Sequence, residues 1–136
     1  MTLKLKAVSP KVGTDIPFPS RATAGSAGLD LRACLDGPVT IAPRQLARIP
    51  TGVAIALPGP EYAALIFARS GLGVKHGISL SNGVGVIDSD YRGEIQVGLT
   101  NLSDAPYTIQ PGDRVAQLVV TPVALPAVEI VEELED

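Results

Sequence analysis

Residues 83–94 read GVGVIDSDYRGE and lie between two apolar segments that are typical of β-strands. The glycines allow the backbone to turn tightly and allow a ligand to approach it. The two aspartates offer carboxylates that can hold a water molecule or a metal ion, and Tyr91 offers a ring that can cover a sugar. An ordinary hairpin is the alternative for this segment taken alone, because Asp and Ser also cap turns by bonding their own backbone.

Short apolar segments separated by turn residues surround this hairpin. Alternation of apolar residues predicts a strand with both faces covered at 53–57 and a half-exposed strand at 95–100. Shorter candidate strands lie at 3–8, 39–42, 62–67, 78–80, 106–109 and 114–120. Many short strands at regular spacing predict an all-β sandwich or barrel. The single helical candidate is a short turn at 70–75, where glycines disfavour a helix.

The composition indicates one small domain with an aliphatic core. Of the 136 residues 46% are hydrophobic but only 4% are aromatic, so Val, Ile, Leu and Ala must fill the core, which suits packed strands. We expect a β domain at 1–120. Residues 121–136 form an arm with an apolar first part, whose prolines suit an edge position, and an acidic end.

The charge is unevenly placed along the chain. The formal net charge is −3, but five of the 14 acidic residues lie in the last eight positions, so the body is mildly basic. This balance argues against a nucleic-acid polymer as partner, which would require a dense basic face. It is compatible with a small anionic ligand held by a few arginines.

Cysteine usage and the amino-terminal segment give further limits. The single cysteine, Cys34, cannot form an internal disulfide, and it is read as a packing residue. The segment MTLKLKAVSP lacks the apolar core of a signal peptide, and no apolar run has the length of a membrane span. We therefore expect a cytoplasmic protein without a membrane partner.

Three further polar segments that contain glycine interrupt apolar runs. They are AGSAGLDLRA at 24–33, FARSGLGVKHGI at 67–78 and PGDRVAQLV at 111–119. Together with the hairpin, they resemble the first four motifs of the trimeric dUTPase family, in the order in which that family carries them. The resemblance covers residues 24–123. The pair ARSG and VIDSDYRGE is the specific part of it, whereas Pro-Gly-Asp is a common turn.

The resemblance implies a jelly-roll-like β-sandwich or barrel in a homotrimer, with the C-terminal arm exchanged between subunits. It implies Mg²⁺-dependent hydrolysis of dUTP to dUMP and pyrophosphate, which lowers dUTP and supplies dUMP for thymidylate synthesis. A dCTP deaminase shares this fold, but VIDSDYRGE and Asn82 match the hydrolase pattern. A module that senses the nucleotide and signals through partner proteins is the alternative that is not an enzyme.

The hairpin carries the expected base and sugar contacts. The Asn82 amide is both donor and acceptor and can match the uracil edge, although Asn-Gly is also a common hairpin turn. The resemblance implies that Asn82 reads uracil, and that Val86, Ile87 and Gln96 line the pocket chiefly through backbone atoms. It also implies that the face of Tyr91 lies under the deoxyribose and leaves no room for a 2′-hydroxyl.

Asp88 is the expected catalytic residue. A carboxylate near a triphosphate can hold a water molecule for in-line attack on the α-phosphorus. The resemblance gives Asp88 this role and also makes it a substrate contact. The second carboxylate of the hairpin, Asp90, is read as a cap of the turn that presents Tyr91.

The other motifs carry the expected phosphate contacts. The Arg69 fork, the Ser70 hydroxyl and the Gly71 backbone can donate to phosphate oxygens, although an Arg at a strand end is often only a solvated ion pair. Gln117 is a polar residue inside an apolar run and needs a partner. The resemblance places Gln117 at the phosphates and Asp30 at Mg²⁺ through water.

Two further expectations concern the last motif and the end of the chain. Arg114 is expected to form a structural ion pair with Asp113. The fifth motif of the family, a glycine-rich tail with an arginine that closes over the phosphates, has no counterpart in residues 1–136. A polypeptide of these residues is therefore expected to bind dUTP but to turn it over slowly.

Overall fold

The computed structural model describes residues 1–136 as eleven short strands and one short helix, which confirms the all-β prediction. The elements of the first half are β1 (Lys4–Ala7), β2 (Leu29–Arg32), β3 (Val39–Ile41), β4 (Leu46–Pro50), β5 (Val53–Ala56) and β6 (Tyr62–Phe67). The second half contains α1 (Ser70–His76), β7 (Ile78–Leu80), β8 (Gly85–Ile87), β9 (Gln96–Asn101), β10 (Tyr107–Ile109) and β11 (Arg114–Pro122).

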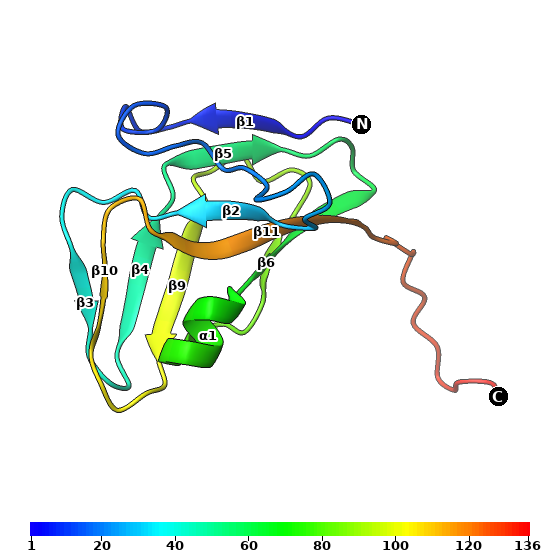
Figure 1. Cartoon of the computed structure of the whole chain (residues 1–136). Coiled ribbons are helices and arrows are strands. Elements are labelled where there is room, and N and C mark those ends of the chain that lie inside the picture. Colours follow the sequence, from blue (N-terminus) through cyan, green and yellow to red (C-terminus); the bar gives the residue numbers. More distant parts are fainter.

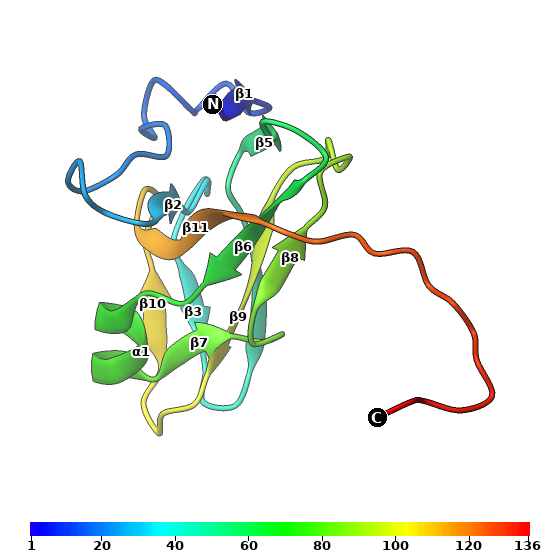
Figure 2. The same ribbon diagram turned by 90° about the vertical axis from the view of Figure 1, so that its right-hand side faces the viewer.

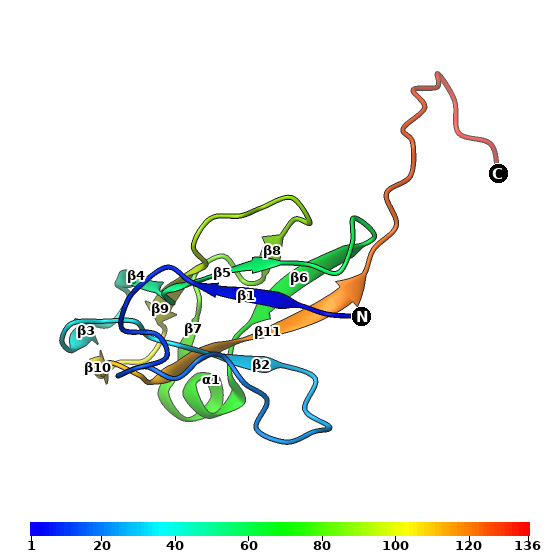
Figure 3. The same ribbon diagram turned by 90° about the horizontal axis from the view of Figure 1, so that it is seen from above.

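The strands form four small sheets in which every pairing is antiparallel. The largest has the order β2-β11-β6-β8, and β11 passes between β2 and β6 in Figure 2. A second sheet has the order β4-β9-β7. The pairs β1-β5 and β10-β3 complete the fold, and Figure 3 shows β1 and β5 side by side. Because β11 pairs with β2 and β6, and β6 pairs with β8, this sheet brings parts of all four predicted motifs together.

Aliphatic side chains from these sheets pack into one core. The buried hydrophobic residues are all Val, Ile, Leu or Ala, as the composition predicted. The largest side chains among those that are almost completely buried are Leu31, Ile41, Ile49, Ile78, Leu99, Ile109 and Leu118. In β5 the first three residues are buried, whereas β9 alternates between buried and more exposed positions, so both predicted burial patterns are confirmed.

Three strands were not predicted, because the local sequence of each gives only a weak signal for a strand. In β2, charged side chains alternate with buried leucines over only four residues. In β4 the apolar Leu46 is exposed and the strand ends at Pro50, and β8 is a three-residue strand that begins with Gly85. Pairing with β11, β9 and β6, respectively, supplies the backbone hydrogen bonds of these strands. Tertiary context therefore decides their conformation.

The predicted helical turn is present as α1. It spans Ser70–His76 in spite of two internal glycines, and it carries Lys75 and His76 in its last turn. It ends at Gly77, whose φ of 68° is left-handed, as is common after the last turn of a helix. The His76 ring packs against Tyr107, with 4.8 Å between the ring centroids.

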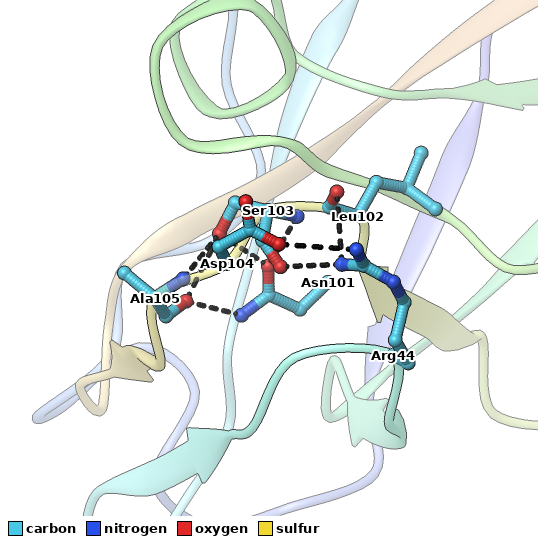
Figure 4. Close-up of polar contacts among 6 residues, drawn as sticks. All are labelled: Arg44, Asn101, Leu102, Ser103, Asp104 and Ala105. Carbon is cyan, nitrogen blue, oxygen red and sulfur yellow. Dashed lines mark hydrogen bonds and ion pairs between the residues drawn. The ribbon is translucent and has the colours of Figure 1, made fainter.

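A buried amide ties two turns at one end of the molecule (Figure 4). Asn101 is fully buried, and its Nδ2 donates to the carbonyl oxygens of Ile41 and Ala105, each at 2.8 Å. Its Oδ1 accepts from the backbone N–H and the hydroxyl of Ser103. Because all these polar atoms have partners, the amide is buried without the cost of an unmade hydrogen bond.

Arg44 fastens the same turn from the outside (Figure 4). Its backbone has a φ of 69°, which is rare for a residue with a side chain. Its Nη1 donates to the carbonyl oxygens of Leu102 and Ser103, and its Nη2 lies 3.1 Å from the Asp104 carboxylate. These contacts join the turn before β4 to the turn after β9.

A second exposed ion pair joins Lys11 to Asp36. The hydrogen bond between the two side chains, followed by their charge interaction, raises the pKa of Lys11 and lowers the pKa of Asp36. Neither residue lines a predicted site, so this pair belongs to the scaffold.

The chain leaves the body after β11. Beyond Pro122 the backbone donates one hydrogen bond to the body, from Val123 to the carbonyl of Glu61 at 2.8 Å. Apolar side chains of this segment are almost fully exposed in the single chain, including Val128 at 89% and Ile130 at 96%. Figures 1 and 2 show the segment extending away from the sheets. The structure contains no helix with the length and apolar character that a membrane-spanning helix needs.

Candidate active site

A cavity of about 450 Å³ opens between the hairpin that contains β8 and the strand β9. We call it the hairpin pocket. Six of the predicted site residues line it, namely Asn82, Val86, Ile87, Asp88, Tyr91 and Gln96. Leu80, just before the hairpin, also lines it, and Arg48 and Ile66 reach it from more distant parts of the sequence. The structure therefore brings the predicted base, sugar and catalytic residues to one concave site.

The entry to the hairpin is a tight turn at Asn82. Gly83 has a φ of 77°, and its N–H donates to the carbonyl of Leu80 at 3.1 Å. The strand β8 then pairs with β6, so that Gly85 faces Ile66. A Cβ at Gly85 would lie 3.0 Å from the Cβ of Ile66, so glycine allows the two strands to approach closely.

The tip of the hairpin presents Asp88 and Tyr91. Asp88 follows the last residue of β8, and its carbonyl accepts from the Tyr91 N–H at 3.1 Å. The Asp88 carboxylate is exposed and makes no hydrogen bond within the chain, so it is free to bind water. The predicted capping role of Asp90 was wrong, because backbone atoms close this turn and the Asp90 side chain bonds to nothing.

The ring of Tyr91 is held in place from its far end. Its hydroxyl donates to the carbonyl of Glu94 at 2.9 Å. A Cβ at Gly93 would lie 2.5 Å from that hydroxyl oxygen, so the glycine leaves room for the ring. The Glu94 carboxylate in turn accepts from the Gly52 N–H at 2.8 Å, which anchors the hairpin to the start of β5.

Sequence reasoning missed Arg48 and Glu94 as residues of this pocket. Arg48 belongs to the unpredicted strand β4 and lies opposite Gly98 of β9. Its place follows only from strand register, for which the local sequence gives no signal. Glu94 lies inside the hairpin motif, and its N–H partner 42 positions away could not be inferred from the motif.

The predicted phosphate residues gather elsewhere, around Asp30. Its Oδ1 accepts from Arg69 Nε at 3.1 Å, and its Oδ2 lies 3.6 Å from Arg114 Nη1. We call Asp30, Arg69, Arg114 and Gln117 the Asp30 cluster. The predicted pair of Arg114 with Asp113 was wrong, because Asp113 instead accepts from the backbone N–H of Gln110 at 2.8 Å. The bulge in β11 directly after Arg114 accompanies this change of partner.

Gln117 has the partner that its position required. It lies on β11 opposite both Asp30 of β2 and Phe67 of β6. Its Nε2 donates to the Ala68 carbonyl at 3.1 Å, directly before Arg69. A Cβ at Gly28 would lie 2.5 Å from its Oε1, so the amide packs over a glycine. Gln117 thus holds the corner at which the predicted phosphate contacts Arg69, Ser70 and Gly71 begin.

None of the Asp30 cluster lines the hairpin pocket. Within one chain, the expected base and sugar contacts and the expected phosphate contacts therefore form two separate groups. Strand β6 connects them, because Ile66 lines the pocket and Arg69 follows three positions later.

Comparison with known sequences matches the chain to one family of enzymes. The family model of dUTPase matches residues 14–136. The chain is 53% identical over 134 residues to deoxyuridine 5′-triphosphate nucleotidohydrolase of Idiomarina loihiensis, covering 98% of this chain and 89% of that protein. It is 49% identical over 136 residues to the protein of the same name from Psychrobacter sp. (strain PRwf-1), covering 98% and 88%.

Solved structures of phage enzymes share the fold. The dUTPase of Staphylococcus bacteriophage 80alpha superposes with a TM-score of 0.85 at 27% identity, covering 99% of both chains. A variant of the dUTPase from phage phi11 of S. aureus superposes with a TM-score of 0.85 at 26% identity over 100% of both chains. That structure details the coordination of a structural Mg(II) ion. The structure of another 80alpha variant, solved with dUpNHpp, superposes with a TM-score of 0.85 at 27% identity, covering 99% of this chain and 90% of that chain.

Proposed function

The chain belongs to the dUTPase family and hydrolyses dUTP to dUMP and pyrophosphate with Mg²⁺, and we propose that the hairpin pocket binds the uracil and deoxyribose of this substrate. The observation that carries the proposal is the convergence of Asn82, Asp88 and Tyr91 on one cavity of about 450 Å³. A concave site with few polar groups among apolar walls is typical of small-molecule pockets.

Base selection rests on the entry of the hairpin. The Asn82 amide can donate to uracil O4 and accept from uracil N3–H, which matches one edge of the base. Val86, Ile87 and Gln96 lie on the two strands that flank the pocket, and their backbone atoms complete the contact. Cytosine carries a donor where uracil carries O4, so it would leave polar groups unpaired.

Sugar selection rests on Tyr91. Its ring is fixed by the bond of its hydroxyl to Glu94 and forms one wall of the pocket. With the deoxyribose against this ring, a 2′-hydroxyl would be buried without a partner. UTP is therefore expected to be a poor substrate.

Asp88 supplies the chemistry. Its free carboxylate holds a water molecule and accepts its proton as the water oxygen attacks the α-phosphorus. The bond from the α-phosphorus to the oxygen that bridges it to the β-phosphorus then breaks. Pyrophosphate leaves with that bridging oxygen, and dUMP keeps the oxygen from water. The position of Asp88, in the pocket and directly after β8, supports this role.

The phosphates are bound by the second group of residues. Gln117 holds the corner at which the segment Arg69 to Gly71 begins. Donor groups of Gln117 and of these three residues bind the phosphate chain. The protein has no group of three or more His, Cys, Asp or Glu placed to hold a metal ion. The absence of such a group fits Mg²⁺ that arrives on the nucleotide and keeps several waters, and Asp30 would bind one of these waters. Mg²⁺ neutralises part of the triphosphate charge.

Two observations support a homotrimer of jelly-roll subunits that exchange C-terminal arms. One nucleotide needs both the hairpin pocket and the Asp30 cluster, which one chain holds apart. A neighbouring subunit can bring the missing group. The arm at 121–136 carries exposed apolar side chains that require a surface to cover them. We place this enzyme in the cytoplasm, where it lowers dUTP and supplies dUMP for thymidylate synthesis.

A nucleotide panel tests the proposal. Pyrophosphate release is measured with dUTP, dCTP, dTTP and UTP at equal concentration, with Mg²⁺ and with EDTA. We expect pyrophosphate release from dUTP that is slow for a polypeptide of residues 1–136 but clearly faster than release from the other three nucleotides, and a lower rate of release in EDTA. Equal turnover of dTTP and dUTP, or deamination of dCTP, would contradict the assignment of the pocket.

A further inference from the structure

The chain contains two asparagines, Asn82 and Asn101, and they lie in opposite environments. Asn101 is fully buried, and its amide donates to two carbonyl oxygens and accepts two hydrogen bonds from Ser103. Asn82 is exposed at the entry of the hairpin pocket, and its amide makes no hydrogen bond within the chain. The Asn82 amide is therefore free to rotate, whereas the Asn101 amide is fixed.

The turn that contains Asn82 places its side chain beside the unobstructed backbone of Gly83. Gly83 has a φ of 77°, and a Cβ at this position would meet no atom within 4 Å. The Val84 N–H donates to the Asn82 carbonyl at 3.0 Å, so Gly83 is the central residue of a three-residue turn, and such turns with a positive φ are strained. The Gly83 N–H donates to Leu80 at 3.1 Å. An exposed turn that is closed by two backbone bonds opens at a low free-energy cost.

We propose that Asn82 is a site of spontaneous deamidation. In the opened turn the backbone nitrogen of Gly83 attacks Cγ of Asn82, because glycine has no side chain that obstructs the approach. The new C–N bond closes a succinimide ring, and the side-chain nitrogen leaves as ammonia with the proton that the Gly83 nitrogen loses. Water then opens the ring at either carbonyl and gives aspartate or isoaspartate. The net reaction consumes one water molecule and requires no oxidant, metal ion or second enzyme.

The modification changes the proposed base contact, so this part of the inference rests on the proposed function. The Asn82 amide both donates and accepts, whereas an ionised aspartate accepts only. Uracil O4 would then face a negatively charged acceptor, and an unpaired polar group in the pocket weakens binding. Isoaspartate adds a methylene group to the backbone and also displaces the turn. We therefore expect affinity for uracil nucleotides to fall as Asn82 is modified.

Bound nucleotide is expected to protect Asn82. A base that is bonded to the Asn82 amide fixes the orientation of the side chain, so its Cγ cannot turn toward the Gly83 nitrogen. A ligand that binds the closed hairpin also stabilises it against opening. The empty pocket is therefore the form in which the reaction occurs.

Timed incubation followed by peptide mass spectrometry tests the reaction. The protein is held at mildly alkaline pH without nucleotide or with saturating dUpNHpp and is then digested with trypsin, which separates Asn82 from Asn101 by cleavage after Arg92. A sample without incubation measures conversion during digestion. We expect the Asn82 peptide to change progressively from amide to acid in the free protein, and more slowly with dUpNHpp. The Asn101 peptide should stay unchanged, and equal rates at the two asparagines would overturn the inference.

The affinity of the modified protein tests the consequence. Anion exchange separates the deamidated form by its additional negative charge, and calorimetry measures its affinity for dUpNHpp. Asn82→Asp reproduces one product, and Gln45→Glu is the matched control, because it makes the same change from amide to acid at an exposed position outside the pocket. We expect the separated form and Asn82→Asp to bind dUpNHpp about tenfold or more weakly than the wild type, and Gln45→Glu to match the wild type.

The outcomes distinguish this inference from the proposed function. An Asn82 that stays intact while dUpNHpp binds would overturn the deamidation and leave the proposed function in place. Equal conversion with and without bound dUpNHpp would show that the nucleotide does not protect Asn82, and unchanged affinity in Asn82→Asp would show that its amide does not contact the base. If the wild-type protein binds no dUpNHpp, the proposed function fails, whereas conversion of Asn82 in the free protein would still support the deamidation.

Discussion

The Tyr91 hydroxyl donates to the carbonyl oxygen of Glu94 at 2.9 Å, and Glu94 bonds through its carboxylate to the Gly52 N–H. The ring that we place under the sugar is thus tied through one residue to the scaffold strand β5. Sugar selection depends on this tie, because a ring that can tilt leaves space for an additional hydroxyl.

Tyr91→Phe is therefore expected to weaken discrimination against UTP while the fold stays intact. The variant loses one hydrogen bond of roughly 1 kcal/mol, which corresponds to about a fivefold change. The ratio of kcat/KM for dUTP to kcat/KM for UTP measures the effect. Tyr91→Ala removes the whole wall and should reduce the ratio further. An unchanged ratio in both variants would show that Tyr91 does not contact the sugar.

Asp88→Asn is expected to leave binding nearly intact and to slow the chemical step. Loss of a general base typically costs roughly 10²- to 10⁴-fold in rate. Single-turnover rates with dUTP and calorimetry with dUpNHpp separate the two effects. Asp90→Asn is the matched control, because this carboxylate is in the same turn but makes no side-chain bond and does not line the pocket. A parallel fall of affinity and rate would make Asp88 a structural residue.

Gly28→Ala is expected to disturb the phosphate corner. A Cβ there would lie 2.5 Å from Gln117 Oε1 and 3.0 Å from Gln117 Cβ, so the amide must move away from Ala68. Overpacking of this kind typically costs about 1–3 kcal/mol, and we expect a lower melting temperature together with a raised KM for dUTP. At Gly25 a Cβ meets nothing within 4 Å, so Gly25→Ala should match the wild type. Identical behaviour of the two variants would contradict this role of Gly28.

The polypeptide of residues 1–136 is expected to sediment as a trimer. The arm exposes apolar side chains that a neighbouring subunit would cover, so Ile130→Asp should weaken the assembly. Sedimentation velocity over a range of concentrations measures the oligomeric state of the wild-type polypeptide and of the variant. A stable monomer with normal dUTP hydrolysis would rule out a site that two subunits share.

The all-β class and the hairpin part of the site could be predicted from the sequence, because both depend on residues that are close together in the chain. The hairpin motif is contiguous, so Asn82, Asp88 and Tyr91 necessarily lie near one another, and the structure places them in one pocket. Strands with strong apolar alternation, such as β5 and β9, were also predictable. By contrast, β2 and β4 consist of residues that form strands only because β11 and β9 pair with them.

Contacts between distant segments could not be predicted. The partner of Arg114 is Asp30 and not the adjacent Asp113, because the bulge in β11 and the register with β2 decide which carboxylate it faces. Arg48 reaches the hairpin pocket for the same kind of reason, through its position opposite Gly98. Strand register is a tertiary property, and a single sequence does not contain a local signal for it.

The most direct test of the account is hydrolysis of dUTP in water enriched in ¹⁸O, followed by mass spectrometry of both products. If Asp88 directs water to the α-phosphorus, one ¹⁸O atom appears in dUMP and none in pyrophosphate. Label in pyrophosphate and not in dUMP would show attack at the β-phosphorus, and would contradict the placement of the catalytic water in the hairpin pocket.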